Sequence, residues 1–256
     1  MPRLLNVYAL PGLIDPGELV GGTAVVIDVL RASTTIVHAL CAGAREVIPC
    51  EEVDEAWALA AALPTNDVLL GGERKGIPIE GFDLGNSPEE YTPERVNGRT
   101  IVFTTTNGTR AIKCASEARR VLIGGFVNVS AILQELIHTE QIHLVCAATA
   151  GQIGRDDVLL AGMLVDRIMH ESGMIGRQNA QAIVAREEWL AAFAVPTAIG
   201  GERLEPHQLA DQLCKSPGGR NLTAIGHRAD IDAAAWIDRF DCVPVFDPEK
   251  NRICLA

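Results

Sequence analysis

The sequence predicts an α/β protein whose mostly parallel or mixed sheet is flanked by helices in three layers. Short apolar runs alternate with Ala-rich amphipathic segments over most of the 256 residues, and this alternation is typical of βαβ units. Hydrophobic residues make up 48% of the chain but aromatic residues only 4%, so the core must be aliphatic, as around buried parallel strands. The length fits one catalytic unit over residues 1–256 or two closely packed lobes with the site between them.

Six runs rich in Val, Ile and Leu are predicted strands, because each is short and bounded by polar or turn-forming residues. These runs are residues 23–29, 46–49, 67–70, 100–104, 120–123 and 143–147. The amphipathic segments between them are predicted helices, at residues 33–42, 53–63, 108–118, 129–138 and 156–171. Gly43 can end the first helix, because glycine adopts the positive φ that commonly closes a helix. Residues 71–85 are rich in glycine and are predicted to be a loop.

The last third of the chain has a less regular pattern. Residues 187–194 and 204–213 are predicted helices, residues 243–246 a strand, and residues 216–222 (SPGGRNL) a loop with a helix cap. No internal repeat and no low-complexity linker interrupts the sequence. Any second lobe is therefore expected to pack closely against the first.

The charge balance and the cysteines narrow the class of protein. A net charge of −11 disfavours a nucleic-acid partner, which would need a basic face. The seven cysteines include no C-x-x-C pair and mostly have apolar neighbours, so we expect free buried thiols rather than a disulfide framework or a zinc site. The sequence has no run of about 20 apolar residues and no long apolar segment near its start. We expect a soluble cytoplasmic protein without membrane contact, and a homo-oligomer stays open.

Polar clusters follow four of the predicted strands, directly after Val29, Leu70, Phe103 and Ala148 or overlapping their last residues. In open α/β sheets, ligands bind beyond the carboxyl ends of the strands. We therefore expect these four clusters to contribute to one binding site.

The first cluster contains Asp28 at the end of an apolar strand, where a carboxylate is costly to bury unless it pairs or binds a cation. One interpretation is an ion pair with Arg31 beside a helix that Ser33 caps. The other is a functional site, in which Ser33 and Thr34 lie beside an anion at the helix start. Leu30 stands where phosphatases of the haloacid-dehalogenase type have the second aspartate of Asp-x-Asp, so that nucleophile-plus-acid pair is missing.

The second cluster is the glycine-rich segment 71–90, GGERKGIPIEGFDLGNSPEE. It carries both signs of charge, including Glu73 and Arg74, and Asn86 and Ser87 precede an acceptable helix start. A solvated surface loop would explain it. A loop of this length with both signs of charge is, however, more often functional.

The third cluster is TTTNGTRA, residues 104–111. Its hydroxyl and backbone N–H groups could surround the oxygens of a phosphate, sulfonate or carboxylate. The structural alternative is a strand end followed by an Asn-Gly turn, with Thr109 as helix cap. Neither G-x-x-x-x-G-K-[ST] nor G-x-G-x-x-G is present, so we expect an anion site without a nucleotide.

The fourth cluster places Asp156 and Asp157 in the first turn of a predicted helix. The helix dipole explains one of these aspartates. The second, together with Asp28 and Glu73, favours a site for a hard cation. Oxygen ligands without nearby His or Cys suit Mg²⁺ better than zinc.

These motifs occur in one order: VVIDVLRASTT, GGERKGIPIEGFDLGNSPEEY, TTTNGTRA, DDVLLAG and SPGGRNL. In this order the sequence resembles the 2-phosphosulfolactate phosphatase (ComB) family, over about residues 24–245. The resemblance implies an α/β fold of the family's own and Mg²⁺-dependent hydrolysis of 2-phospho-3-sulfolactate to 3-sulfolactate and phosphate, a step of coenzyme M biosynthesis. The chain departs from the family pattern in having Asp156 where Glu is usual, and Ala234 or Ala235 where a Cys is usual.

The resulting hypothesis is a phosphoric monoester hydrolase in which Asp28, Glu73 and Asp157 bind Mg²⁺, with Asp156 as a substitute ligand. The expected catalytic residues are Asp28, Arg31, Glu73 and Asp157. The expected contacts to the small anionic phosphorylated substrate are Ser33, Thr34, Arg74, Asn86, Ser87, Thr105, Thr106, Asn107, Gly108, Thr109, Arg155 and Arg220. The alternatives are an aspartyl-phosphate on Asp28, another 2-phospho-hydroxy acid as substrate, and a non-catalytic binder of small anionic metabolites.

Overall fold

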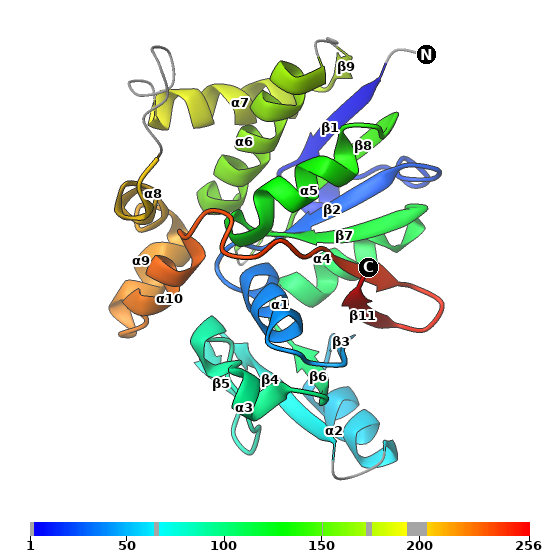
Figure 1. Ribbon diagram of the computed structural model, residues 1–256, viewed down its shortest axis with the longest axis vertical. Helices are drawn as coiled ribbons and strands as arrows, with labels where there is room; N and C mark the ends of the chain where they lie inside the picture. The colour runs from blue at the N-terminus through cyan, green and yellow to red at the C-terminus, as the bar shows by residue number, and fades with distance from the viewer. Residues whose placement is uncertain (1–2, 64–66, 150, 173–175, 194–203) are drawn as a thin grey trace.

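One mixed sheet organises the chain, and helices flank it on both faces (Figure 1), so the predicted fold class is confirmed. The computed structural model describes residues 3–63, 67–149, 151–172, 176–193 and 204–256. In this part of the chain eleven strands form the sheet, in the order β5-β4-β6-β3-β11-β10-β7-β2-β8-β1-β9. They are β1 Leu4–Tyr8, β2 Thr23–Ile27, β3 Glu46–Cys50, β4 Val68–Arg74, β5 Ile77–Pro78, β6 Thr100–Thr104, β7 Arg120–Gly124, β8 Gln141–Cys146, β9 Arg177–Gln178, β10 Pro244–Asp247 and β11 Arg252–Leu255.

The sheet contains two groups of parallel strands. The first strand group is β9, β1, β8, β2 and β7, and the second strand group is β3, β6 and β4. The carboxyl-terminal hairpin β10–β11 lies between them and is antiparallel to both neighbours. Adjacent strands rotate by about 20–25°, so the twist accumulated between β2 and β6 lets the carboxyl ends of the two groups approach each other.

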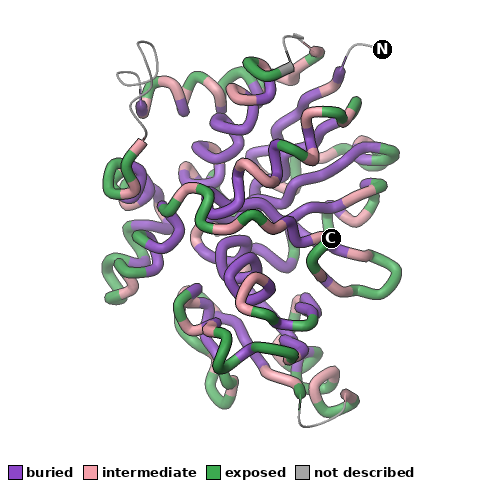
Figure 2. Tube along the Cα trace, in the orientation of Figure 1, coloured by how far each residue is buried: buried purple, intermediate pink, exposed green. Residues whose placement is uncertain are grey.

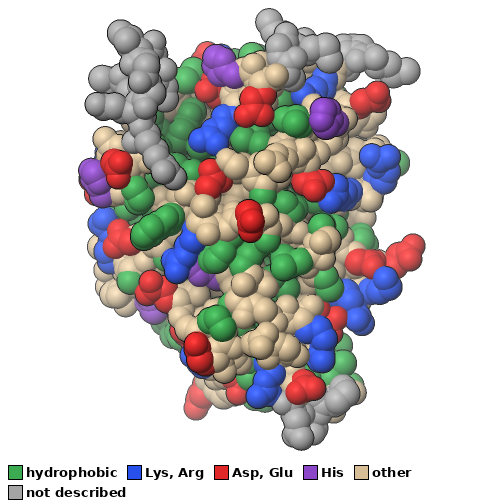
Figure 3. Space-filling view, viewed as in Figure 1, with side chains coloured by type: hydrophobic (Ala, Val, Ile, Leu, Met, Phe, Trp, Pro, Cys, Tyr) green, Lys and Arg blue, Asp and Glu red, His purple; other side chains and the backbone are tan. Residues whose placement is uncertain are grey.

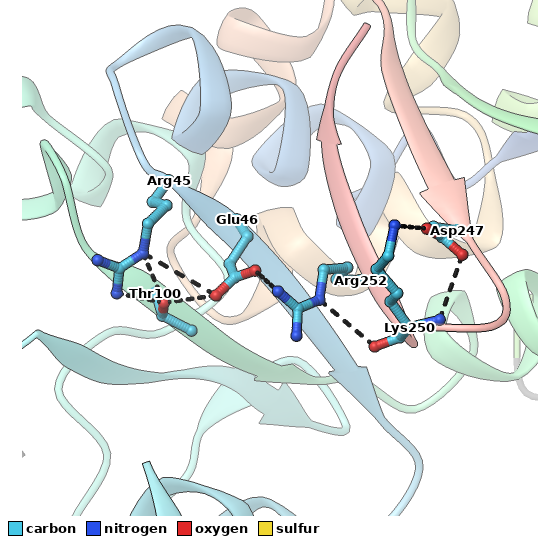
Figure 4. Close-up of polar contacts among 6 residues, drawn as sticks. All are labelled: Arg45, Glu46, Thr100, Asp247, Lys250 and Arg252. Carbon is cyan, nitrogen blue, oxygen red and sulfur yellow. Dashed lines mark hydrogen bonds and ion pairs between the residues drawn. The ribbon is translucent and has the colours of Figure 1, made fainter. Parts of the chain in front are cut away.

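The carboxylate of Glu46 joins the hairpin to the second strand group (Figure 4). The hydroxyl of Thr100 on β6 donates to Glu46 Oε1 at 2.8 Å, and Arg252 Nη1 on β11 donates to Glu46 Oε2 at 2.8 Å. At the hairpin turn, Lys250 Nζ pairs with Asp247 Oδ2 at 3.0 Å. Glu46 thereby links three neighbouring strands at a place where the backbone pairing of β11 with β3 is short.

Helices cover the sheet according to which strand group they follow. The α-helices are α1 Ala32–Cys41, α2 Val53–Ala62, α3 Pro93–Val96, α4 Gly108–Cys114, α5 Val129–Leu136, α6 Arg155–Ser172, α7 Ala180–Ala192, α8 Pro206–Leu213, α9 Pro217–Ala224 and α10 Arg228–Ala234. The 3₁₀ turns are η1 Pro11–Leu13, η2 Pro88–Glu90, η3 Ala115–Glu117 and η4 Phe126–Asn128. Helices α5 to α10 share one apolar core with the first strand group. Helices α1 and α4 share a second core with both groups, and α2 packs on the second group alone.

The burial pattern follows from this arrangement. Strands β1, β2, β7 and β8 of the first group are buried along most of their length, as Figure 2 shows in purple. Val25 faces the core of α5 and α6, whereas its neighbour Val26 faces the core of α1 and α4. Alternate residues of one strand point to opposite faces, and both faces are covered, so the strand reads as a continuous apolar run.

Strand β4 is longer than the sequence predicts. Residues 71–85 are predicted as a loop, but β4 continues to Arg74 and forms a hairpin with β5. Gly72 has a φ of +140°, and a Cβ there would lie 1.9 Å from the carbonyl oxygen of Thr104. Only glycine permits this approach of β4 to β6, so the residue that signals a loop is required here inside a strand.

The segment SPGGRNL forms helix α9 rather than the predicted loop. Ser216 is its N-cap and accepts a hydrogen bond from the N–H of Gly219 at 2.9 Å. A Cβ at Gly219 would lie 2.1 Å from the carbonyl oxygen of Leu213. The glycines therefore permit α9 to pack against the end of α8, and they do not break the helix.

Further elements differ from the predictions or were missed. Helix α7 begins before the predicted helix 187–194, and Ala194 lies outside the described residues. Strands β1, β9 and β11 and helix α10 were not predicted. β1 pairs with β8 in the sheet. Its apolar segment is short, so the sequence pattern did not identify it as a strand.

Two of the cysteines are paired. Cys41 at the end of α1 and Cys242 before β10 form a disulfide, so the expectation of free thiols is wrong for this pair. Cys50 and Cys146 are buried free thiols as expected, whereas Cys114 is exposed. A pairing across 201 sequence positions leaves no local signal in the sequence.

The surface carries both signs of charge. On the face in Figure 3, acidic and basic side chains are interspersed. The whole chain has a net charge of −11, so cations that attract an anionic ligand must be local to its site. Within the described residues, no helix combines the length and the apolar character that crossing a membrane requires.

Candidate active site

A pocket of about 280 Å³ lies where the carboxyl ends of the two strand groups approach each other. Its walls come from the segments that follow β2, β4, β6 and β8, and from α9. The structure thus brings all four polar clusters together. The predicted site residues that line the pocket are Asp28, Arg31, Glu73, Asn86, Thr105, Thr106 and Asn107.

The TTTNGTRA turn reaches Asp28 because Gly108 has no side chain. A Cβ at Gly108 would lie 2.8 Å from Asp28 Oδ2 and 2.4 Å from the Cβ of Ala32. Thr109 is not the helix cap, since Asn107 occupies that position without a side-chain cap bond. The hydroxyl of Thr109 donates instead to the carbonyl oxygen of Thr105 at 3.0 Å. Gly108 and Thr109 therefore shape the turn and do not line the pocket.

Asp28 is a buried carboxylate, 7% exposed. Burial raises its pKa to about 7, and the negative charges of Asp156 and Glu73 also raise it. The N–H of Ala32 and the charge of Arg31 lower the pKa of Asp28 without offsetting these effects. The ion pair between Asp28 and Arg31, one of the two interpretations of this cluster, does not form, since Arg31 pairs with Asp230. Asp28 therefore lines the pocket without a basic side chain bonded to it.

The two aspartates at the start of α6 have different surroundings. Both oxygens of Asp157 accept backbone hydrogen bonds, from the N–H of Val29 at 2.9 Å and of Ala148 at 3.2 Å. Asp156 Oδ1 is buried and has no hydrogen-bond partner. Burial raises the pKa of Asp156 to about 6 and raises that of Asp157 as well. Asp157 thus anchors the ends of β2 and β8, and Asp156 has the free acceptor.

Glu73 holds the β4–β5 hairpin against the threonine turn. Its carboxylate accepts the N–H of Gly76 at 2.5 Å and the N–H of Thr106 at 2.8 Å. The N–H of Thr106 is therefore already used within the protein. The side chain of Glu73 supports the pocket from two sides.

Arg31 is the buried cation of the pocket, with an exposed fraction of 4%. Its Nη1 pairs with Asp230 Oδ2 at 2.5 Å, and its Nη2 donates to the carbonyl oxygen of Gly76 at 2.9 Å. A guanidinium has five N–H donors, so these two contacts leave donors for a ligand. Asp230 lies on α10 and was not among the predicted site residues.

Ser33 and Thr34 support the turn after β2 and do not line the pocket. The N-cap of α1 is Arg31, so the prediction that Ser33 caps this helix is wrong. Ser33 Oγ accepts the N–H of Asp28 at 2.9 Å, and Thr34 Oγ1 donates to the carbonyl oxygen of Val29 at 2.8 Å. Both hydroxyl groups satisfy backbone groups beside Asp28, which fixes the position of its carboxylate.

Three predicted arginine contacts lie outside the pocket lining and have other partners. Arg74 Nη2 donates to the carbonyl oxygen of Glu51 at 2.7 Å and to Thr104 Oγ1 at 2.9 Å. Arg155 pairs with the Glu188 carboxylate at 2.6 Å. Arg220 donates to the carbonyl oxygen of Lys215. The structure therefore does not bring these arginines to the pocket with Arg31.

Lys75 lines the pocket in place of its neighbour Arg74. The register of β4 and β5 makes Lys75 and Gly76 the loop of the hairpin, and both have positive φ, 56° and 84°. This is the geometry of a type I′ turn, in which Asn-Gly is the favoured pair. A lysine is an unfavourable residue at such a position. Gly76 is the favoured residue at the second position of such a turn. This glycine in ERKG is the signal that could have placed Lys75 in the hairpin loop.

The carboxylates fit a hard cation as a pair rather than as the predicted set. Among residues in the described ranges, no group of three or more His, Cys, Asp or Glu side chains could hold one metal ion. Glu73 and Asp157 already use both oxygens for backbone N–H groups. Asp28 and Asp156 remain, with a free buried oxygen on Asp156 and mutual repulsion that raises the pKa of Asp28. Oxygen donors of this kind suit Mg²⁺.

The fold and the site together define the class of protein. Carboxylates that fit a hard cation, a buried arginine and a threonine-rich turn at strand ends form a site suited to phosphoryl transfer, where positioning and charge stabilisation dominate. Residues 8–249 match the model of the 2-phosphosulpholactate phosphatase family. The chain belongs to this family of phosphoric monoester hydrolases, as its motifs predict.

Relatives named "Probable 2-phosphosulfolactate phosphatase" are similar over most of their length. One from Symbiobacterium thermophilum is 40% identical over 230 residues, which are 90% of this chain and 93% of the relative. One from Caldanaerobacter subterraneus subsp. tengcongensis is 37% identical over 243 residues, 94% of each chain. One from Thermotoga maritima is 38% identical over 223 residues, 87% of this chain and 88% of the relative.

Proposed function

We propose that this protein hydrolyses 2-phospho-3-sulfolactate to 3-sulfolactate and phosphate with Mg²⁺, a step of the kind used in coenzyme M biosynthesis. The observation that carries the proposal is a pocket lined by Asp28 and Arg31, with the buried carboxylate of Asp156 beside Asp28. Family membership and the names of the relatives support a phosphate ester as substrate. A substrate with a phosphate, a carboxylate and a sulfonate would use both the cation site and the basic side chains.

We assign the proposed Mg²⁺ to Asp28 and Asp156, in place of the predicted set that included Glu73 and Asp157. Mg²⁺ is commonly bound by one or two carboxylates together with substrate phosphates and waters, so two carboxylates suffice. When bound there, the ion supplies positive charge that offsets the charge on the phosphoryl oxygens.

The side chains of the pocket divide the remaining tasks. Arg31 and Lys75 supply the positive charge of the protein itself, and Thr105, Asn107 and Asn86 supply neutral hydrogen-bonding groups. Fixed groups of this kind orient the substrate and stabilise charge on its oxygens. The pocket is small enough to favour a compact substrate.

The proposed reaction is a direct attack of water on phosphorus. The oxygen of the water bonds to phosphorus, the ester bond between phosphorus and the C2 oxygen breaks, and a proton passes from the water to that departing oxygen. Asp28 lines the pocket and accepts a hydrogen bond from the attacking water. The alternative is a covalent aspartyl-phosphate on Asp28.

The configuration at phosphorus separates these two reactions. The substrate carries a thiophosphoryl group made chiral with oxygen isotopes, and it is hydrolysed in isotopically labelled water. One direct attack inverts the configuration of the released thiophosphate, whereas two successive displacements through an aspartyl-phosphate on Asp28 retain it. Retention would contradict direct attack and support the covalent route.

A phosphate-release assay with related substrates tests the function itself. The panel is 2-phospho-3-sulfolactate, 2-phospholactate and 2-phosphoglycerate, each with Mg²⁺ and with EDTA. We expect Mg²⁺-dependent release, with the highest kcat/KM for the sulfonate. A higher kcat/KM for 2-phospholactate or 2-phosphoglycerate would show that this compound, and not the sulfonate, is the preferred substrate. Calorimetric binding of 3-sulfolactate without any phosphate release would favour a non-catalytic binder.

Lys75→Met is expected to raise KM for the sulfonated substrate by about tenfold, since a lost hydrogen bond to a charged group costs about 1.5–3 kcal/mol. The effect on 2-phospholactate should be smaller, because that substrate lacks the sulfonate. Lys113→Met is the matched control, since Lys113 is exposed and pairs with Glu51 at 2.6 Å outside the pocket. Equal effects of Lys75→Met on both substrates would contradict this role.

Mg²⁺ is expected to raise the melting temperature more at pH 8 than at pH 5.5. The folded-state pKa values of Asp28 and Asp156 are raised to about 7 and about 6, so at pH 5.5 protons compete with the ion. Because these pKa values lie above the unfolded ones, the two groups lower the unfolding free energy as pH rises from about 4 to 7. Bound Mg²⁺ offsets that loss. Thermal unfolding with Mg²⁺ or EDTA at both pH values makes the measurement, and equal shifts would contradict the proposed ligands.

A further inference from the structure

Asp230 on α10 contacts two different walls of the pocket at once. One oxygen, Oδ2, pairs with Arg31 Nη1 at 2.5 Å, and the other, Oδ1, accepts a hydrogen bond from Ser87 Oγ at 2.5 Å. His227 Nδ1 is a third neighbour, 3.4 Å from Oδ2. Asp230 is 2% exposed and does not line the pocket, so its carboxylate acts on the protein and not directly on a ligand.

The Arg31 guanidinium is held at two points. Asp230 binds one terminal nitrogen, and the carbonyl oxygen of Gly76 accepts from the other at 2.9 Å. Gly76 lies at the tip of the β4–β5 hairpin, so the two contacts reach Arg31 from separate elements. Because a long arginine side chain has many rotamers, fixing both nitrogens before a ligand arrives lowers the entropy cost of binding an anion.

The second contact of Asp230 fixes the corner that contains Asn86. Ser87 is held by Asp230 Oδ1, and the carbonyl oxygen of Asn86 accepts from Thr35 Oγ1 at 3.1 Å. The side chain of Asn86 is 4% exposed, lines the pocket, and its Oδ1 has no hydrogen-bond partner. A buried polar atom without a partner is costly. This oxygen is an acceptor, so a donor in the pocket, such as a water or the hydroxyl of 3-sulfolactate, would supply the partner.

We propose that Asp230 is a positioning residue, which sets Arg31 and Asn86 in the geometry that binds the anionic substrate. This rests on the proposed function only for the identity of that substrate. The carboxylate is required because it offers an acceptor to each partner. An asparagine has a single acceptor oxygen, and its NH₂ group cannot accept from the guanidinium or the hydroxyl.

Calorimetric binding of 3-sulfolactate and of inorganic phosphate to the whole chain tests the proposal without requiring turnover. We expect Asp230→Asn to weaken binding of at least one of these anions by about tenfold. The matched control is Asp232→Asn on the same helix, because Asp232 is exposed and pairs with Arg228 at 3.2 Å. The control should bind like the wild type.

A double-mutant cycle distinguishes positioning from general support of the fold. If Asp230 acts through Arg31, Asp230→Asn should weaken binding by less than about threefold in the Arg31→Lys background. Equal effects in both backgrounds would overturn the proposal, as would unchanged binding by Asp230→Asn or no binding of either anion by the wild type. Ser87→Ala and Asp230→Glu are measured in addition, so that the proposal can still be tested if the Asp230→Asn variant misfolds. Ser87→Ala should lose less affinity than Asp230→Glu, which displaces Arg31, and the reverse order would overturn the proposal.

The outcomes separate this proposal from the proposed function. A chain that binds anions in an Asp230-dependent way but releases no phosphate keeps the positioning role and loses the function. A chain that hydrolyses the substrate equally well with Asp230→Asn keeps the function and loses the positioning role.

Discussion

Asp156→Asn is expected to lower kcat for the phosphate ester by about a thousandfold while stabilising the metal-free fold. The activity falls because Asp156 Oδ1 is the free buried acceptor next to Asp28, and an amide oxygen is a weaker ligand for a hard cation. Phosphate release with saturating Mg²⁺ makes the first measurement.

The stability effect has a definite pH dependence. Burial raises the folded-state pKa of Asp156 to about 6, from an ordinary value of 3.8. Its ionisation therefore lowers the unfolding free energy progressively as pH rises from about 4 to 6, and the whole loss is present at higher pH. In EDTA at pH 8, the unfolding free energy of the Asp156→Asn variant should therefore exceed that of the wild type by about 1 kcal/mol or more. At pH 5 the difference should shrink, which thermal unfolding can measure.

Asp166→Asn is the matched control for Asp156→Asn, because both residues lie on α6. Asp166 pairs with Arg186 at 2.9 Å outside the pocket, so this variant should lose some stability and keep full activity. An Asp156→Asn protein with activity within threefold of the wild type would falsify the proposed cation site.

Arg31→Met is expected to lower both activity and stability. The variant removes the buried cation of the pocket, which should reduce kcat/KM by about a hundredfold or more. It also leaves the buried carboxylate of Asp230 without its arginine, and breaking a buried ion pair from one side costs about 3–5 kcal/mol. Steady-state kinetics and urea unfolding on the same preparation measure the two effects.

The contrast with other arginines makes this prediction specific. Arg155→Met removes an arginine that pairs with Glu188 outside the pocket, and its kcat/KM should stay within about threefold of the wild type. If Arg31→Met and Arg155→Met have the same kinetic effect, Arg31 is not the anion contact. Loss of stability in Arg31→Met with unchanged kcat/KM would contradict the role as well.

The sequence pattern was sufficient to predict which segments contribute residues to the site. Asp28 ends an apolar run, and TTTNGTRA follows another, so both were placed at strand ends from spacing alone. Asp28 follows β2 of the first strand group and TTTNGTRA follows β6 of the second, and the antiparallel hairpin β10–β11 separates the two groups. The two clusters line one pocket, as the sequence predicts. Their approach, however, depends on the twist of the whole sheet, which the sequence pattern does not show.

The division of labour between neighbouring residues was not predictable. Asp156 and Asp157 are adjacent and chemically identical, yet only Asp157 finds the N–H groups of Val29 and Ala148. Successive residues of a helix are rotated by about 100°. Which carboxylate is satisfied by the backbone depends on how α6 is rotated against β2 and β8, and the sequence carries no measure of that rotation.

The partner of Arg31 shows the same limit over a longer distance. One interpretation of the spacing paired Arg31 with Asp28, three positions away, but the ion pair forms with Asp230, which is 199 positions away. Asp230 lies in a helix that the sequence did not predict, and the Cys41–Cys242 disulfide also joins α1 to this last part of the chain. Long-range pairs of this kind leave no periodic signal.

The sequence by itself determined the α/β class, the family and the segments that form the pocket, because alternating apolar runs and the order of polar motifs are local properties of the chain. Only the tertiary structure decided that Lys75 and not Arg74 lines the pocket, that Asp156 and not Asp157 keeps a free oxygen, and that Asp230 holds Arg31. One position along a strand or hairpin turns a side chain to another side. The direction of a side chain is set by the packing of elements that are distant in sequence.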